Sequence, residues 1–301
     1  MAGHGDSNRA ILFALGANFV IFVTKGIAAF ITGSGAMLAE TVHSLADCGN
    51  QLLLLLGLRQ ARIPPSPDYP LGYGKAIYFW SFLVAVILFS VGGMFSLYEG
   101  VHKLQHPEPL QQWWWAVGVL VISIAAEAVS MRACLVEVNK ARGSRSITRW
   151  FRESRQAELI VIFGEDLAAL LGLIFALVAV VAAVVTGDPV WDAIGTLAIG
   201  VLLIVVAVFV AIEVKAMLIG QSADPEVSTS IKAFFEERAE IDRVFSLITL
   251  QLGNDLMVAV KVQLHRSATL SAEDIINTVE REFKRRFPQV KWSFVEPDSA
   301  D

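Results

Sequence analysis

Charge is scarce in this chain. Only 18% of its 301 residues are charged and 55% are hydrophobic, and its mean hydropathy is +0.58. These values exclude an ordinary soluble domain and place the chain in the membrane class. The net charge of −5 leaves no basic surplus for nucleic acid, so we expect no nucleic-acid partner.

Cysteine is almost absent as well. The two cysteines, Cys48 and Cys134, both lie inside long apolar stretches. The sequence therefore offers neither a disulfide framework nor a CxxC zinc motif. It also lacks an HExxH motif and any recognisable motif around a serine or cysteine nucleophile, which argues against an enzyme.

Long apolar runs, by contrast, are plentiful. A membrane-spanning helix needs roughly 20 mostly apolar residues. Six stretches have this character, at about 10–33, 36–59, 76–100, 112–136, 157–186 and 189–218. The first is too long for a signal peptide and contains Lys25, so we interpret it as a span. We therefore predict a six-span α-helical transmembrane domain over residues 1–220.

The loops between these runs predict an orientation. Basic residues gather in the connections at 59–75 and 132–155, and the opposite loops carry almost none. By the positive-inside rule, both basic connections and both chain ends face the cytoplasm. Within the second connection we interpret Arg149, Trp150 and Arg152 as anchors to anionic headgroups.

Residues 221–301 differ in composition from the rest, because they are charged and alternate between element types. The expected elements are a helix at 224–240, strands at 244–253 and 256–264, a helix at 271–287 with Ser271 as N-cap, and a strand at 290–297. This αββαβ order predicts a cytoplasmic, ferredoxin-like α+β domain with its helices on one face of a three-stranded sheet. The free edge or face of such a sheet suits pairing with a second copy, so we expect a homodimer.

Polar side chains interrupt the second apolar run. His43 and Asp47 are four residues apart, and Asn50 follows Asp47 by three, so all three share one helical face. An imidazole and a carboxylate at this spacing suit a divalent cation, and zinc accepts both ligand types. Additional oxygen ligands would admit manganese or iron(II). The alternative interpretation is a polar network that only holds helices together.

Two adjacent acids, Glu165 and Asp166, lie in the fifth run. Adjacent helical residues point about 100° apart, so both cannot face one site directly. A bound dication opposite His43 and Asp47 would supply their counter-charge. Three further positions are weaker candidates for ligands: Glu127, Asp192 near the outer end of the sixth run, and Lys25, which either snorkels or pairs with an acid.

Together these motifs resemble those of the cation diffusion facilitator family of metal/proton antiporters. The resemblance rests on "TGSGAMLAETVHSLADCGNQ", on "PLGYGKAIYFW" and on the αββαβ tail, and it covers nearly the whole chain. The segments "HSLADCGNQ", "GEDLAALLG" and "FVEP" are similar to the branch that contains the mitochondrial zinc exporter and its bacterial relatives.

The resemblance implies a tetrahedral transport site with two ligands from the second span and two from the fifth. His43 and Asp47 match the first pair, and Asp166 matches the last position. The remaining position holds Ile162, which departs from the family pattern. The expected metal ligands are therefore His43, Asp47 and Asp166, with Glu165 or Asn50 as the variable ligand.

Two other metal sites of the family are eroded here. The loop after the second span carries Tyr73 where the family has a histidine, although Asp68 remains. The tail keeps only His265, and aromatic Trp292 and Phe294 occupy its last strand. We expect a tail that dimerises without being a strong zinc sensor.

The resemblance also implies a function and a location. We expect an antiporter in a bacterial inner membrane that exports zinc from the cytoplasm by alternating access, with protons as counter-ion. Mn²⁺, Fe²⁺ and Co²⁺ are possible substrates in place of zinc. One alternative is a non-transporting membrane scaffold with a degenerate metal site, and another is an intramembrane enzyme that uses His43 and Asp47.

Overall fold

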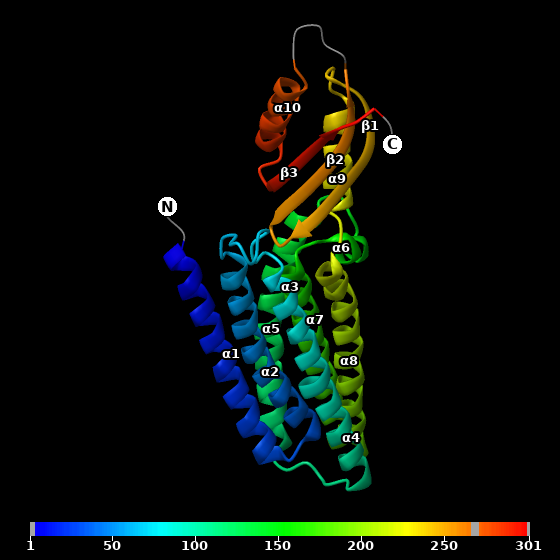
Figure 1. Cartoon of the computed structure of the whole chain (residues 1–301). Helices are drawn as coiled ribbons and strands as arrows, with labels where there is room; N and C mark the ends of the chain where they lie inside the picture. The colour runs from blue at the N-terminus through cyan, green and yellow to red at the C-terminus, as the bar shows by residue number, and fades with distance from the viewer. Residues whose placement is uncertain (1–3, 266–270, 300–301) are drawn as a thin grey trace.

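The computed structural model describes residues 4–265 and 271–299 of the chain. The molecule is mostly helical: a bundle of long helices carries a small three-stranded sheet with two helices at one end (Figure 1). The first helix begins at the same end of the bundle as the sheet (Figure 1). The expected mixture of a helical membrane part and an αββαβ tail is thus found.

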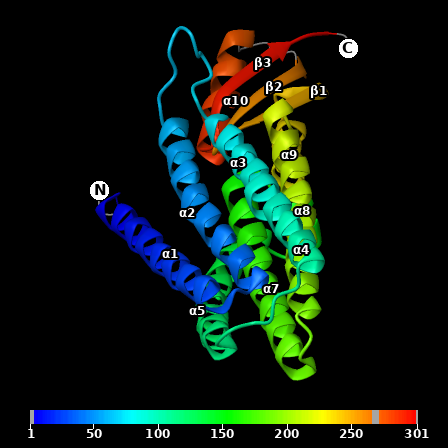
Figure 2. The same ribbon diagram turned by 90° about the horizontal axis from the view of Figure 1, so that it is seen from below.

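The bundle follows the apolar runs of the sequence. Its helices are α1 (His4–Thr32), α2 (Gly35–Ala61), α3 (Ala76–Ile87), the π-helical η1 (Leu88–Met94), α4 (Phe95–Gln105), α5 (Trp113–Arg142), α7 (Ala157–Thr186) and α8 (Val190–Ile219). Helix α1 lies at the edge of the bundle and contacts α2 and α5 (Figure 2).

Four of these segments are long and apolar enough to cross a membrane, counting only residues that the structure describes: Ala76–Gln105, Trp113–Arg142, Ala157–Thr186 and Val190–Ile219. Helix α1 has a shorter apolar part, Asn18–Thr32, and α2 carries the polar residues of the second run. The class of an α-helical membrane protein is confirmed, and the number of six spans stays a prediction.

Two glycines of the π-helical segment within the third run permit close packing against α8. A Cβ on Gly93 of η1 would lie 2.6 Å from Ile204 of α8, so only glycine permits this approach. Gly92, its neighbour, faces Leu203 of α8 and the ring of His43. Such bulges often mark functional positions, and this one brings the third run against the histidine of α2.

The connection between α5 and α7 contains a helix that the sequence did not predict, α6 (Ile147–Glu153), which Ser146 caps. The expectation that Trp150 anchors to headgroups is wrong. Its side chain is fully buried and packs edge-on against Phe163 of α7 at 6.0 Å between ring centroids. The indole contributes to the core at the end of the bundle because burying so large an apolar surface is more favourable than exposing it.

The tail has the expected order of elements: α9 (Pro225–Glu236), β1 (Ile241–Leu252), β2 (Asp255–Leu264), α10 (Ala272–Arg286) and β3 (Val290–Pro297). Strand β2 lies centrally, antiparallel to β1 and parallel to β3. Ser271 caps α10 as predicted. Alternate residues of β2 face the helices, and Phe235 of α9 contacts Phe283 of α10 in the same core, so both helices cover one face.

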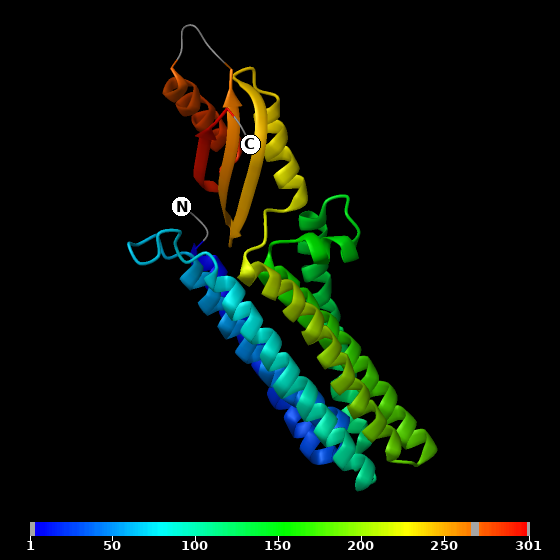
Figure 3. The same ribbon diagram turned by 45° about the vertical axis from the view of Figure 1, so that its right-hand side comes forward.

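The turn between β1 and β2 docks on the end of the bundle (Figure 3). The buried hydroxyl of Tyr78 in α3 accepts a hydrogen bond from the Gly253 amide at 2.9 Å and lies 3.4 Å from its carbonyl. Gly253 has a φ of +69°, and its backbone lies so close to Gly74 that neither position has room for a Cβ.

The start of the tail also contacts the connection between α5 and α7. Arg145, which follows α5, pairs with Asp224 at 2.6 Å, and Arg155 donates to the Ser222 carbonyl at 2.7 Å. The start of the tail is therefore clamped to the α5–α7 connection, while its hairpin turn is fixed to α3.

We predict that Tyr78→Phe loosens the hairpin turn. Two hydrogen bonds are lost from a buried position, which weakens docking by about 1–2 kcal/mol and speeds amide exchange at Gly253 by about tenfold. Hydrogen–deuterium exchange on the full chain measures this. Tyr98→Phe, at an exposed tyrosine of α4, is the control. Equal exchange at Gly253 in both variants would contradict the role of the hydroxyl.

Candidate functional site

The start of α2 is fixed by an acid from another helix. Asp192 of α8 accepts hydrogen bonds from the Ser34 hydroxyl at 2.5 Å and from the Gly35 amide at 2.7 Å. Ser34 in turn caps α2 by accepting from the Met37 amide. Asp192 is 3% exposed, so it is a buried structural cap and not a solvated surface acid.

One helical turn of α2 carries His43 and Asp47. His43 is fully buried, and its Nδ1 lies 3.7 Å from Oδ1 of Asp47. Neither ring nitrogen of His43 has a hydrogen-bond partner within the described residues, and the same holds for Asp47 Oδ1. Buried polar atoms without partners are costly, and a cation is the ligand that satisfies an imidazole nitrogen and a carboxylate oxygen together.

Asn50 and Glu165 join α2 to α7. The Asn50 amide nitrogen donates to Oε1 of Glu165 at 2.5 Å, and both side chains are buried. The predicted variable ligands are thus in direct contact with each other. This bond orients the Glu165 carboxylate and leaves its second oxygen for other contacts.

Asp166 points in a different direction from its neighbour Glu165, as the helical geometry requires. Both of its carboxylate oxygens lie 3.4 Å from the hydroxyl of Ser130 on α5. Ser130 belongs to a polar stripe on α5 with Ser123 and Glu127, spaced by four and three residues. The sequence interpretation treated Glu127 alone and missed the stripe, although its helical spacing was visible.

A polar cavity of about 60 Å³ brings these groups together between α1, α2, α5 and α7. Three of the five predicted site residues line it, namely Asp47, Glu165 and Asp166. His43 and Asn50 do not line it, but each contacts a residue that does. The charged and hydroxyl groups that complete the lining are Lys25, Ser44, Ser123, Glu127 and Ser130.

The predicted ligands do not form a complete coordination shell here. No three His, Cys, Asp or Glu side chains in the described part of the chain are grouped closely enough to hold one metal ion. Ile162, at the position where the family has a ligand, is 38% exposed and does not line the cavity. The four-ligand site therefore stays a prediction.

The structure also places Lys25, the last of the weaker candidates, and the tail histidine His265. Lys25 does not snorkel: its ammonium group is buried and bonds Glu40 at 3.0 Å and the Ser44 hydroxyl at 2.8 Å. In the tail, Nδ1 of His265 lies 2.8 Å from Oδ1 of Asp242.

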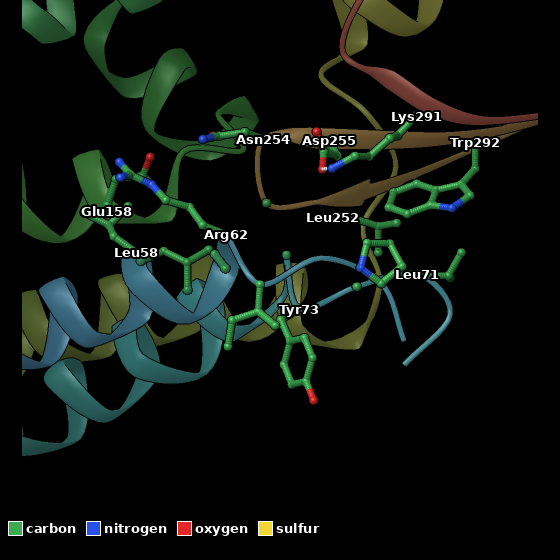
Figure 4. Close-up of a pocket in the computed structure, with 17 residues that line it drawn as sticks. Leu58, Arg62, Leu71, Tyr73, Glu158, Leu252, Asn254, Asp255, Lys291 and Trp292 are labelled. Atoms are coloured by element: carbon green, nitrogen blue, oxygen red, sulfur yellow. Dashed lines mark hydrogen bonds and ion pairs between the residues drawn. The ribbon is translucent and has the colours of Figure 1, made fainter. Parts of the chain in front are cut away.

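A larger cavity of about 330 Å³ lies where the tail meets the bundle (Figure 4). Tyr73 lines it together with Arg62, Glu158 and Trp292, and Lys291 pairs there with Asp255 at 2.7 Å. Its charges are of both signs, and no histidine lines it. The smaller cavity inside the bundle is therefore the better candidate for a cation.

Comparisons with known proteins identify the family to which the bundle is similar. A model of the cation efflux transmembrane domain matches residues 11–219. The mitochondrial proton-coupled zinc antiporter SLC30A9 of Homo sapiens is 32% identical over 250 residues, which cover 81% of this chain and 44% of that protein. The manganese efflux system protein MneP of Bacillus subtilis (strain 168) is 23% identical over 292 residues, 95% of this chain and 93% of MneP.

For a plant relative, the matched shares of the two chains lie between those of SLC30A9 and MneP. Metal tolerance protein C4 of Arabidopsis thaliana is 31% identical over 249 residues, which cover 82% of this chain and 54% of that protein. The chain spans less than half the length of the zinc antiporter, but nearly the full length of MneP.

We predict that Asp192→Ala destabilises the fold without weakening metal binding. The Ser34 hydroxyl and the Gly35 amide lose their acceptor, at a cost of about 1–3 kcal/mol. Thermal unfolding in detergent should show this, and Asp192→Asn, which keeps one acceptor oxygen, should lie closer to wild type. Unchanged unfolding together with lost zinc binding would instead identify Asp192 as a ligand.

Proposed function

This chain belongs to the cation efflux family of membrane transporters, and from that membership we propose that it is a divalent metal/proton antiporter that exports zinc from the cytoplasm. The observation that carries this proposal is the pair His43 and Asp47. Their facing atoms are buried and unpartnered in α2, beside a cavity lined by carboxylates of α2, α5 and α7. Such atoms are suited to a cation that binds and leaves.

The proposed ligands of the transported metal are His43, Asp47 and Asp166, with Glu165 as the fourth. Asn50 then orients Glu165 through the hydrogen bond between them. Because these side chains are not grouped closely enough to hold one ion in the described residues, metal binding requires side-chain rearrangement or a small shift of α7 relative to α2.

Protons compete with the metal for the same groups. A metal ligand must be deprotonated, so each ligand that takes up a proton helps to release the ion. Alternating access of the cavity to the two sides then exchanges a cytoplasmic metal ion for protons from outside. The small residues that line helix contacts, such as Gly93 and Gly172, permit the close packing over which helices slide.

Zinc is our first choice of substrate, with manganese second. The imidazole of His43 favours zinc, and the name of the relative SLC30A9 states a zinc antiporter. Three or four carboxylates around one imidazole also suit manganese, which MneP is named for, and Fe²⁺ and Co²⁺ have similar ligand preferences.

The proposed arrangement in the membrane has six spans, formed by α1, α2, the α3–η1–α4 run, α5, α7 and α8. Residues 1–220 form the transport domain and residues 221–301 the cytoplasmic domain. The positive-inside rule places both chain ends in the cytoplasm, and the shared location of the α1 start and the tail supports this (Figure 1). A bacterial plasma membrane is the proposed location.

A homodimer through the tail sheet is part of the proposal. Ile248, Ala259 and Phe294 are aligned across the three strands on the face opposite α9 and α10. Ile248 is 61% exposed and Phe294 is 56% exposed. An apolar row on an otherwise solvated sheet suits burial against the same row of a second copy.

We predict that metal uptake into proteoliposomes depends on Asp47, on Asp166 and on a pH gradient. Zinc, manganese and iron(II) are compared for wild type, Asp47→Asn and Asp166→Asn. Flux falls by at least about tenfold in both variants, because even changes outside the ligand shell reduce metal affinity roughly 10–100-fold. Glu108→Gln, at an exposed carboxylate outside the cavity, is the control and keeps wild-type flux.

Two outcomes would change the proposal. Gradient-dependent flux that survives in Asp166→Asn would remove that residue from the ligand set. No flux with any of the three metals from well-folded wild type would favour a non-transporting scaffold.

We also predict that the double variant Ile248→Asp/Phe294→Asp shifts the dimer toward monomer. Two carboxylates on the apolar row would have to be desolvated in the interface, which is unfavourable. Light scattering in detergent measures the mass. Ser230→Asp, on the helical side of the same domain, is the control. A dimer of unchanged stability in the double variant would place the interface elsewhere.

A further inference from the structure

The acidic cavity contains one cation of its own. Lys25 is the one basic side chain among the described residues that line it, and it is 3% exposed. Burying an ammonium group in an apolar bundle is costly. Holding helices together does not require this cost, because a neutral polar pair would serve that purpose equally well.

The position of the ammonium group relative to its partners is informative. Lys25 Nζ donates to Glu40 Oε2 at 3.0 Å and to Ser44 Oγ at 2.8 Å. An ammonium group has three N–H donors, so a third remains for the cavity. Ser44 itself lines the cavity, next to His43 in the sequence.

Glu40, whose carboxylate balances the charge of Lys25, is not among the residues that line the cavity. Its Oε1 is packed against α7, where a Cβ on Gly172 would lie 2.5 Å away. The positive end of this buried ion pair therefore faces the cavity, and its negative end faces the helix packing. Of the pair, Lys25 lines the cavity and Glu40 does not, so a dication there would meet the positive end of the pair.

We propose that Lys25 is an electrostatic release residue, a fixed positive charge that weakens metal binding in the cavity and so allows the ion to leave. This inference rests on the proposed transport function. Several carboxylates in a medium of low dielectric would otherwise hold a dication too tightly for rapid turnover. Lys25 acts on the metal through the field and not as a ligand.

Three forms of the protein, which differ in the charges at positions 25 and 40, test this role. Wild type has the paired charge, Lys25→Met/Glu40→Gln has none, and Lys25→Arg/Glu40→Gln has an unpaired positive charge that stays protonated. The single variant Lys25→Arg keeps the pair and serves as rescue. Lys140→Met, at an exposed lysine at the end of α5, is the matched control.

Zinc alone is titrated into each full-length variant by calorimetry in detergent, and zinc flux is measured in proteoliposomes. We expect the neutral variant to bind zinc several-fold more tightly than wild type, with a lower KM and a lower maximal flux. The unpaired variant binds about tenfold or more weakly than the neutral one, because charges interact over long distances in the bundle. Lys25→Arg and Lys140→Met resemble wild type.

The outcomes separate this inference from the function on which it rests. If wild type binds and transports zinc but the neutral and unpaired variants have equal dissociation constants and KM values, the pair is only structural and the inference is wrong. A change in unfolding temperature alone leads to the same conclusion. If wild type neither binds nor transports a metal, the proposed function fails and the inference fails with it.

Discussion

The structure depends on one constraint: polar groups inside an apolar bundle have no water to bond and must find partners in the protein. Asp192 meets this requirement at the start of α2, Lys25 with Glu40 between α1 and α2, and Asn50 with Glu165 between α2 and α7. Each pair also fixes the position of α2 against a different neighbour. The two ring nitrogens of His43 and the facing Oδ1 of Asp47 have no such partner among the described residues, and the proposed function assigns them one from outside.

The site and the tail are joined by a single helical run. Tyr78, near the start of α3, holds the β1–β2 turn, and Gly92, fourteen residues later in η1, lies against His43. At 1.5 Å per residue this corresponds to about 21 Å of continuous helix. The residue that docks the tail and a residue that lies against His43 are therefore parts of the same helical run.

The sequence was sufficient for the features that depend on local periodicity. The long helices of the bundle, the αββαβ order, the cap at Ser271 and the common helical face of His43 and Asp47 all follow from spacing, whereas α6 does not. Features that depend on which neighbour lies opposite could not be predicted. Asp192 was a weak candidate for a ligand and is a buried cap, and Trp150 was expected to anchor to headgroups and lies in the core. The close approach of η1 to α8 at Gly93 involves two segments far apart in the sequence, which no single segment reveals.

Several carboxylates line the cavity although position 162, where the family has a ligand, is an isoleucine. Ile162 lies one turn before Asp166 and does not line the cavity, so a carboxylate is missing from that turn of α7. Glu165, held by Asn50, and Glu127 on α5 line the cavity from two other directions. The negative charge that a dication requires is therefore distributed over three helices. Lys25, the one basic side chain among the described residues that line the cavity, thus shares it with carboxylates from all three helices.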